Sequence, residues 1–588
     1  MSRLLIASEK KIVELFRKHN KDVGFEEFAF SQEGGAFLST FKKMKIDNVN
    51  YYEEKEYFVA ISGTLIYKGG IGTNSLKELL DDYRLNNDVN TLRSLIIGNY
   101  LCVIGTPDRI IVFCDPNNIY YGYYYQGERG WCISNSLYEM ASAIGNGITM
   151  DEDVLLEEMY CRCIIGNDTV FKEIKRLLGD EAVVIYADGR FVVEKLRITG
   201  MEAVKEGTIE QWVMSFCSEI ENVCKTIGHC FSQDVSIAMT GGVDSRTSLA
   251  GFVGAGLKPK LYYGKGNSLL AETKPQDEKI CEEIADKLHL ELEKMDWSMP
   301  DIIDKDWDEL ERKYGFLSRV YSGSKALLSS FESQTSQFIT YGYFGESYSY
   351  DVPRKKTTFT IDDFLDYYIG TRVPHLAHDY RRFRENMSKK CTKIIDPENK
   401  MEGVYPIDKW ILLELHMRQK KDSVLVNFSN QHRYSMAVLA EKDLLKYSYI
   451  PVKYKRDRTF LLKSINVLCP QLTEIPVFTH MEKRTIDKKR MKLTVPMKEY
   501  IKELIKRYVR SNFVKAFLIK VNQYKSGMKG ASESSKTGRL KQQLMDIARH
   551  QTYLPHEIFA EKSTNLSLET RYLMTIELLQ KKNHYYES

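Results

Sequence analysis

The sequence contains one stretch, Ser236-Ile-Ala-Met-Thr-Gly-Gly-Val-Asp-Ser-Arg246, in which an apolar run ends in two glycines and an Asp-Ser pair. The run from Val235 to Met239 predicts a short buried strand. Apolar residues follow at helical spacing from Leu249 to Phe252, so a helix is predicted to begin near Asp244. A glycine turn between a strand and a helix exposes backbone N–H groups at the positive end of the helix. Such an end binds phosphate or pyrophosphate well.

Two interpretations of this turn are open. It is either a tight structural turn with a helix cap, or an anion site. In the second case Asp244 is not itself a phosphate ligand, and it is expected to hold a bridging Mg²⁺. The stretch matches neither G-x-x-x-x-G-K-[ST] nor G-x-G-x-x-G.

The composition indicates a large globular protein. At 588 residues the chain exceeds one ordinary core, so two large domains are expected. The net charge of +4 does not by itself imply a polyanionic partner. No uninterrupted apolar run approaches the roughly 20 residues of a membrane span. The eleven cysteines lack zinc or redox spacing, which favours reduced core thiols and a cytoplasmic location.

Residues 1–195 are predicted to form a strand-rich domain. The tyrosines at 120–125 are expected to pack in its core. Strands are expected at 58–67, 100–105, 109–115, 120–125 and 130–134, with a hairpin at 180–193.

In residues 205–588 the expected order of elements is different, because helices and strands alternate. This alternation predicts a parallel sheet with helical crossovers. The ligand of such a sheet lies at the carboxyl ends of the strands, which brings Met239-Thr240 and Tyr263-Gly264 to one site. Helices are expected at 208–226 and 277–288, and strands at 235–239, 260–265, 290–297 and 337–341.

The stretch Thr240 to Ser245 resembles the pyrophosphate loop, Ser/Thr-Gly-Gly-x-Asp-Ser, of the ATP pyrophosphatases. Tyr341-Gly-Tyr-Phe-Gly-Glu346 resembles the second glycine cluster of the asparagine synthetase family, and residues 412–476 resemble its helical half. The nearest pattern is that of the β-lactam synthetases and the lasso-peptide-cyclase type of macrolactam-forming members. In this alignment Phe344 stands at the family's second glycine, and Phe478 stands where a catalytic lysine is expected.

The resemblance implies an α/β protein of two domains. Residues 1–195 would form an Ntn-hydrolase-like αββα domain of the glutaminase type. Residues 205–588 would form a PP-loop, adenine nucleotide α-hydrolase-like domain with a helical C-terminal half. Ser2 stands where such a glutaminase has its catalytic cysteine, and Ser62 replaces the asparagine of the oxyanion hole. We therefore expect the glutaminase-type domain to be degenerate.

The resemblance also implies roles for individual residues. Mg²⁺ would be held by Asp244 and Glu346. Tyr343 would act with Glu414 on an amine, and Lys483 is the nearest lysine to replace the one missing at Phe478. Arg246 has no counterpart that explains it. The residues implied to bind ATP are Met239, Thr240, Gly241, Gly242, Asp244, Ser245, Tyr263, Gly264, Tyr341 and Gly342.

The function expected from this pattern is an ATP-dependent ligase that adenylates a carboxylate and joins it to ammonia or to a substrate amine. The substrate is expected to be a small molecule or a peptide. Two alternatives stay open: an enzyme that adenylates a base in tRNA, and a degenerate ATP-binding protein. The sequence does not fix the oligomeric state and is compatible with a homodimer.

The region 483–588 is expected to be a basic helical extension. Residues 483–541 contain 18 Lys and Arg but 4 Asp and Glu. A solvated helical surface and a docking face for an acidic peptide, carrier or RNA both fit this charge.

Overall fold

A computed structural model describes residues 2–478 and 483–484. Its larger gaps fall at 198–203, 266–274, 297–332, 350–356 and 369–379. Residues 456–457 and single residues at 34, 146, 162, 205, 399, 402 and 422 also lie outside the described part.

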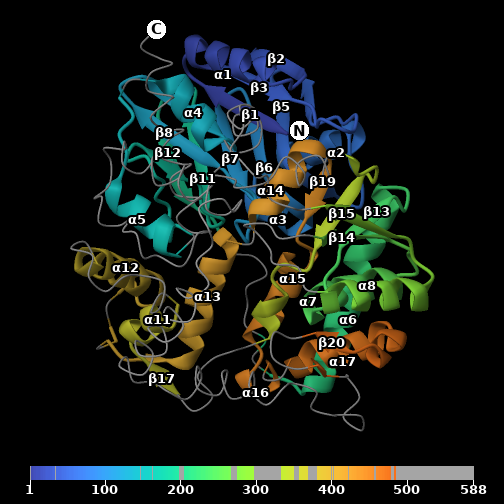
Figure 1. Cartoon of the computed structure of the whole chain (residues 1–588). Helices are drawn as coiled ribbons and strands as arrows, with labels where there is room; N and C mark the ends of the chain where they lie inside the picture. Colours follow the sequence, from blue (N-terminus) through green and yellow to red (C-terminus); the bar gives the residue numbers. More distant parts are fainter. Residues whose placement is uncertain are drawn as a thin grey trace, which may run out of the picture.

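The first 195 residues form two antiparallel six-stranded sheets (Figure 1). The first has the order β10-β8-β9-β1-β3-β2 and the second the order β12-β11-β7-β6-β5-β4. The first sheet consists of β1 (Arg3–Ala7), β2 (Glu27–Glu33), β3 (Ala36–Phe41), β8 (Tyr123–Gly127), β9 (Gly130–Ser134) and β10 (Ile174–Arg176). The second consists of β4 (Tyr51–Glu54), β5 (Tyr57–Tyr67), β6 (Ile96–Gly105), β7 (Arg109–Cys114), β11 (Glu181–Tyr186) and β12 (Phe191–Lys195).

Strand alternation explains why these sheets stack. Phe58 and Ala60 of β5 lie in the core between the two sheets, whereas Val59 and Ile61 lie in the core beneath α2. Both faces of the strand are therefore apolar, as expected for a sheet covered on both sides. The resulting order of layers is helix, sheet, sheet, helix, which confirms the αββα arrangement expected for this part. The helices are α1 (Lys10–Asp22), α2 (Thr73–Asn86), α3 (Val89–Leu95), α4 (Leu137–Ile144) and α5 (Glu152–Cys161).

One strand prediction in this part is wrong at its start. Residues 120–122 do not belong to β8, because the Asp115 carboxylate accepts hydrogen bonds from the backbone N–H groups of Ile119 (3.1 Å) and Tyr120 (2.8 Å). These bonds hold residues 115–120 as a turn, and the strand begins at Tyr123. Burial raises the pKa of Asp115 to about 7. The tyrosines themselves are mostly buried, as expected.

The second part of the chain contains a five-stranded sheet in which all pairs are parallel. Its order is β15-β14-β13-β16-β19, which is 3-2-1-4-5 along the chain. The chain therefore reverses direction across the sheet between β13 and β16, at the topological switch point. The strands are β13 (Val235–Ala238), β14 (Lys260–Lys265), β15 (Leu292–Asp296), β16 (Phe338–Tyr341) and β19 (Tyr434–Met436).

Helices surround this sheet, and the predicted ones are present with small shifts at their ends. The first helix begins with a capping box, in which Thr208 and Gln211 bond each other's backbone N–H. The helices are α6 (Ile209–Cys230), α7 (Val243–Gly254), α8 (Pro275–Leu288), α11 (Ile361–Tyr368), α12 (Tyr380–Ile395), α13 (Ile407–Lys421), α14 (Ser423–His432), α15 (Lys442–Leu445), α16 (Val452–Lys455) and α17 (Thr459–Leu468). The short elements used below are η2 (Gly345–Tyr348), β20 (Val477–Phe478) and β21 (Lys483–Arg484).

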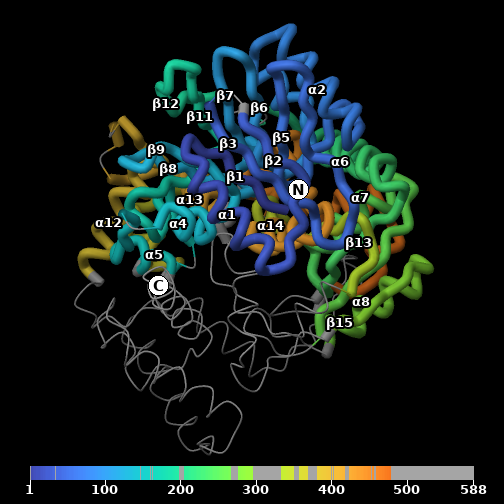
Figure 2. Tube along the Cα trace, turned by 90° about the horizontal axis from the view of Figure 1, so that it is seen from above, coloured from blue at the N-terminus to red at the C-terminus, as the bar shows by residue number. Residues whose placement is uncertain are grey.

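The two parts are packed against each other, and one hydrophobic cluster contains buried residues from both. Figure 2 places α7, α8 and β13 on one side of the molecule and α5, β8 and α12 on the other. Besides this apolar packing, polar hydrogen bonds cross the seam, several of them to α14. Arg3 donates from Nε to Gln431 Oε1 (3.2 Å), and Thr64 donates from Oγ1 to Asn430 Oδ1 (2.8 Å). The Asn427 side chain accepts from the backbone N–H of Tyr121 (2.9 Å).

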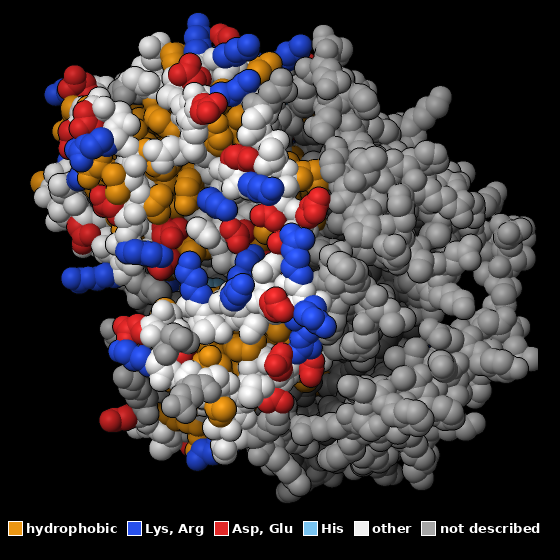
Figure 3. Space-filling model, turned by 90° about the vertical axis from the view of Figure 1, so that its left-hand side faces the viewer, with side chains coloured by type: hydrophobic (Ala, Val, Ile, Leu, Met, Phe, Trp, Pro, Cys, Tyr) orange, Lys and Arg blue, Asp and Glu red, His pale blue; other side chains and the backbone are white. Residues whose placement is uncertain are grey.

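The surface and the cysteines agree with the composition. On the face shown in Figure 3, basic and acidic side chains are intermixed around apolar areas. All eleven cysteines are free thiols, and ten of them are buried. Of the helices in the described part of the chain, none combines the length and apolar character needed to cross a membrane.

Candidate functional site

Two glycine loops leave adjacent strands at the switch point of the parallel sheet. Residues 240–242 lead from β13 into α7, and residues 342–344 lead from β16 into η2. The two strands pair in parallel with Ala238 opposite Tyr341, so both loops emerge at the same edge of the sheet. The general rule for open α/β sheets places a ligand at this edge.

The two loops touch through their glycines. A Cβ atom added to Gly342 would lie 2.3 Å from the backbone nitrogen of Ser245. One added to Gly345 would lie 2.3 Å from the Cβ atom of Asp244. Real Cβ atoms do not approach this closely, so glycine is required at both positions. The second glycine contact is thus made by Gly345, one residue beyond the Phe344 position in the alignment.

Hydrogen bonds within the first loop fix its shape. The backbone N–H of Thr240 donates to Ser245 Oγ (3.2 Å), which in turn donates to the carbonyl of Thr240 (3.2 Å). The N–H of Gly242 donates to Thr240 Oγ1 (3.3 Å). The Ser245 hydroxyl, expected to bind pyrophosphate, therefore also closes the turn that presents the helix N-terminus.

A carboxylate from the neighbouring helix reaches into this loop. The backbone N–H of Gly241, which was expected to bind pyrophosphate, donates to Asp277 Oδ1 at 3.1 Å. Asp277 is the third residue of α8. From the sequence, this segment is predicted only as a helix. Asp277 was missed as a site residue, because no pattern in the sequence joins Asp277 to the glycine loop.

Arg246, unexplained in the sequence, is fully buried and joins the loop helix to a distant segment. Its guanidinium donates to the carbonyls of Leu472 (3.1 Å), Ile475 (2.8 Å) and Pro476 (2.9 Å). Burial lowers the pKa of Arg246 to about 10, so the group stays charged at neutral pH. Arg246 is therefore a packing residue that fixes the segment leading into β20.

The second loop presents aromatic residues with different roles. Tyr341 is buried, its hydroxyl shares a hydrogen bond with Ser429 Oγ (2.5 Å), and burial raises its pKa. The ring of Tyr343 stacks on that of Tyr341 at a centroid distance of 5.2 Å and an interplanar angle of 27°. Tyr341 thus provides a rigid surface on which the less buried Tyr343 lies.

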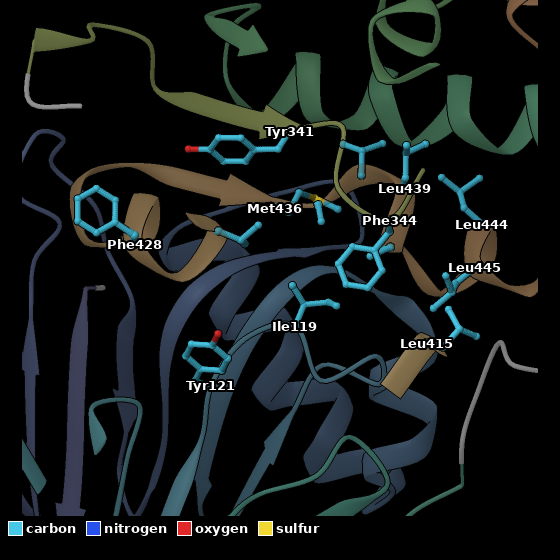
Figure 4. Close-up of a cluster of buried hydrophobic side chains, with 14 of the residues drawn as sticks. Ile119, Tyr121, Tyr341, Phe344, Leu415, Phe428, Met436, Leu439, Leu444 and Leu445 are labelled. Atoms are coloured by element: carbon cyan, nitrogen blue, oxygen red, sulfur yellow. The ribbon is translucent and has the colours of Figure 1, made fainter. Parts of the chain in front are cut away.

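Phe344 adopts a left-handed backbone conformation, with φ of 71°. A bulky residue rarely takes this conformation, and its cost is about 1–3 kcal/mol. Its ring is fully buried in a cluster that includes Leu415, Met436 and Leu439 (Figure 4). Packing of the ring therefore offsets the strain of the left-handed backbone at this position.

Glu414 lies on α13, which packs against η2, so it is close to the second loop. A lysine that sequence reasoning missed is buried beside it. Lys455 donates from Nζ to the carbonyl of Ser347 (3.2 Å). Burial lowers the pKa of Lys455 to about 7, against the opposing charges of Glu414 and Asp408. Its run, Lys-Tyr-Lys-Arg, is typical of a solvated surface, so the sequence gives no signal for it. The Tyr343–Glu414 pair stays a prediction.

Met239 and Tyr263-Gly264, which the resemblance implies to bind the adenosine part of ATP, lie at the ends of two neighbouring strands. The backbone N–H of Met239 donates to the carbonyl of Tyr262 (2.7 Å), which holds the end of β13 against β14. The side chains of Met239 and Tyr263 are both buried, and Gly264 follows in the same strand.

The predicted metal ligands lie on the two touching loops. Asp244 is in the first turn of α7 and Glu346 follows Gly345, whose backbone contacts Asp244. Within the residues that the structure describes, no group of three or more His, Cys, Asp or Glu side chains is placed to hold a metal ion. Two carboxylates fit an ion that takes its other ligands from substrate phosphates and water, as Mg²⁺ commonly does.

Lys483 lies in β21, where its backbone pairs with Phe478 of β20. Phe478, which stands where the catalytic lysine is expected, and Lys483, its nearest replacement, therefore pair in one short hairpin. The side chain of Lys483 lies outside the described residues. The basic helical extension expected beyond residue 484 also lies outside the described residues.

The position that the resemblance assigns to a glutaminase nucleophile is buried. Ser2 is fully buried, and its hydroxyl donates to the carbonyl of Lys42 (2.6 Å). Its own carbonyl accepts from Asn135 Nδ2 (3.0 Å) and Gln431 Nε2 (3.1 Å). Ser62, at the oxyanion position, shares a hydrogen bond with Tyr120 (2.7 Å). These polar groups are used in structural bonds.

Comparison with known proteins gives similarity to solved structures only. No family model matches the sequence, and no curated protein matches it. One similar structure is the allosteric regulatory enzyme of purine biosynthesis, at 9% identity and a TM-score of 0.22; the match covers 44% of this chain and 64% of that one. Another is the glutamine phosphoribosylpyrophosphate (PRPP) amidotransferase from B. subtilis, complexed with ADP and GMP. It has 7% identity and a TM-score of 0.23, and the match covers 59% and 76% of the two chains. The chain thus spans less than two thirds of the first of these structures.

Proposed function

We propose that this chain is an ATP-dependent ligase of the asparagine synthetase type, which adenylates a carboxylate and joins it to an amine. The observation that carries the proposal is the contact between the two glycine loops at the switch point of the parallel sheet. Gly342 and Gly345 lie against Ser245 and Asp244, so the two loops that carry the proposed nucleotide and metal positions are in contact.

The proposed placement of ATP follows the edge of the sheet. Adenosine would lie at the ends of β13 and β14, near Met239 and Tyr263-Gly264. The pyrophosphate would lie at the N-terminus of α7, which carries roughly half a positive charge. Asp244 and Glu346 would hold Mg²⁺, which when bound would neutralise the charge of the leaving pyrophosphate.

The proposed reaction has two steps. An oxygen of the substrate carboxylate attacks the α-phosphorus of ATP, the bond to the β-phosphate oxygen breaks, and pyrophosphate leaves. The lone pair of an amine then attacks the acyl carbon, the bond to the adenylate oxygen breaks, and AMP leaves. Tyr343 and Glu414 are proposed to orient the amine and to accept its proton.

The closed environment of Ser2 bears on the source of nitrogen. Because its hydroxyl and carbonyl are engaged in the core, we propose that the chain does not hydrolyse glutamine. The amine is then free ammonia or part of the substrate, as in macrolactam formation within a peptide. We further propose that the basic C-terminal region binds an acidic peptide or carrier.

An ATP–pyrophosphate exchange assay over a panel of carboxylates tests this function. We expect exchange without an acceptor amine, and we expect Asp244→Ala to lower its rate by about a hundredfold or more. Asp286→Ala removes an exposed carboxylate of α8 and serves as the matched control. Absence of exchange with every carboxylate, together with unchanged ATP binding in Asp244→Ala, would contradict the proposal.

One observation weighs against the tRNA alternative in its sulfur-transferring form. Such a reaction needs an accessible thiol, and ten of the eleven cysteines are buried. Burial raises the pKa of the remaining, partly exposed Cys230 to about 11, which disfavours its reactive thiolate. Salt-sensitive tRNA binding would favour this alternative over the ligase.

A further inference from the structure

Asp277 occupies a position that an anionic ligand would be expected to take. Its Oδ1 atom accepts the backbone N–H of Gly241 at 3.1 Å, in a partly buried hydrogen bond. Gly241 belongs to the turn between β13 and α7, and Asp277 belongs to the first turn of α8 in the next βα unit. A carboxylate oxygen and a phosphate oxygen are both anionic acceptors, so the two groups compete for the same N–H.

Charged side chains of α8 and of the neighbouring strands lie near this contact. Lys265 and Lys294 lie near its first turn, and both form ion pairs with Glu278, at 3.3 and 3.0 Å. Lys294 also pairs with Glu282 at 2.5 Å. These lysines are thus engaged by the neighbouring carboxylates, while Asp244 adds another acidic residue to the turn itself.

We propose that Asp277 is a specificity-determining residue that makes the glycine loop accept a pyrophosphate group as its magnesium complex and reject the uncomplexed anion. Beside the Asp277 carboxylate, a free polyphosphate meets like-charge repulsion. A cation carried by the phosphate removes most of that repulsion and is drawn to the same carboxylate. This proposal rests on the proposed function and names the form of the substrate.

The substitution Asp277→Asn separates charge from hydrogen bonding, because an amide oxygen still accepts the N–H of Gly241. Asp277→Ala removes both. Asp286→Asn is the matched control, since it removes an exposed carboxylate from the same helix and leaves the ion pairs of Glu278 with Lys265 and Lys294 in place. Thermal unfolding of each variant checks that the fold is retained.

Isothermal titration calorimetry with inorganic pyrophosphate, at fixed ionic strength, is carried out once with EDTA and once with excess Mg²⁺. We expect Asp277→Asn and Asp277→Ala to bind metal-free pyrophosphate about tenfold or more tightly than the wild type, because a like-charge contact is removed. With Mg²⁺ the gain should shrink to about threefold or less. Asp286→Asn should resemble the wild type in both conditions.

The two proposals fail in different ways. If the wild type binds magnesium pyrophosphate but the Asp277 variants bind the metal-free anion no better than it does, the role of Asp277 is wrong and the ligase site stands. If the wild type binds pyrophosphate in neither condition, the anion site itself is wrong, and both proposals fall.

Discussion

The surroundings of Ser2 and the pair of glycine loops are both places where the sequence suggests chemistry, and they differ in how their polar groups are used. Around Ser2 the hydroxyl and the carbonyl bond to Lys42 and Asn135, which directly follow β3 and β9, and to Gln431 of α14, and the side chain is fully buried. In the glycine loops Thr240 is exposed and Asp244 and Glu346 are partly so. The first region is therefore part of the core, whereas side chains of the second are accessible to solvent.

The largest effects on stability are expected for substitutions of two buried arginines, Arg246 beside the glycine loops and Arg3 beside Ser2. Arg246→Met leaves two buried carbonyls and one partly buried carbonyl without their donor, and Arg3→Met leaves Glu139, its ion-pair partner at 3.2 Å, buried without that partner. Each should lower the free energy of unfolding by about 3–5 kcal/mol, measured by denaturant titration.

The comparison becomes sharper when pyrophosphate binding is measured on the same two variants below their unfolding transitions. Arg246→Met should weaken binding, because Arg246 belongs to the helix that starts at the loop. Arg3→Met should leave binding unchanged. Equal loss in both variants would show that the two regions are not separate in function.

A smaller effect is expected at Gly345. In Gly345→Ala the new Cβ atom meets the Cβ of Asp244 at 2.3 Å, so one of the loops must move. We expect a loss of about 1–3 kcal/mol in the free energy of unfolding, together with weaker binding of magnesium pyrophosphate. In Gly70→Ala the new atom meets Ser75 at an ordinary 3.5 Å, which makes it the matched control. Normal binding by Gly345→Ala would show that the contact between the loops is unimportant for the site.

The next effect is a pH dependence at Lys455. Burial lowers its pKa from the ordinary lysine value of 10.5 to about 7 in the folded state. Between these values the unfolded chain binds more protons than the folded one, so stability rises with pH, by up to about 1.4 kcal/mol per unit. Lys455→Met should reduce this rise between pH 7 and 10, as measured by urea unfolding across that range. Buried Lys43, whose pKa is also lowered by burial, keeps its own contribution. The exposed neighbour Lys453 provides the control, since Lys453→Met should leave the slope as in the wild type. A slope in Lys455→Met as steep as that of the wild type would assign the pH dependence to other groups.

The smallest effect is expected at Ser2. Ser2→Ala removes one buried hydrogen bond and should cost about 1 kcal/mol in the free energy of unfolding. Neither the wild type nor the variant should release ammonia from glutamine in a coupled assay. Release by the wild type that Ser2→Ala abolishes would return Ser2 to the role of a nucleophile.

The elements with clear periodicity could be predicted from the sequence. The strand at Val235, the helix after Asp244 and the hairpin around Asp188-Gly189 are present, because alternation and glycine turns are local signals. The start of β8 could not be predicted, since it depends on the buried Asp115 carboxylate. For the site, the sequence identified the two glycine loops but missed Asp277 and Lys455. Their importance arises from packing between elements that are distant in the chain.

The bond between Arg3 and Gln431 also constrains how the chain is made. The two residues are 428 positions apart, so at about 5–20 residues per second a ribosome reaches the second roughly 20 to 90 seconds after the first. Until then the polar groups of the first sheet that bond to α14 lack these partners. We therefore predict that nascent chains stalled before α14 are cleaved by protease near β1, while chains stalled well beyond residue 478 resist. Early resistance would mean that the first half folds without its later partner.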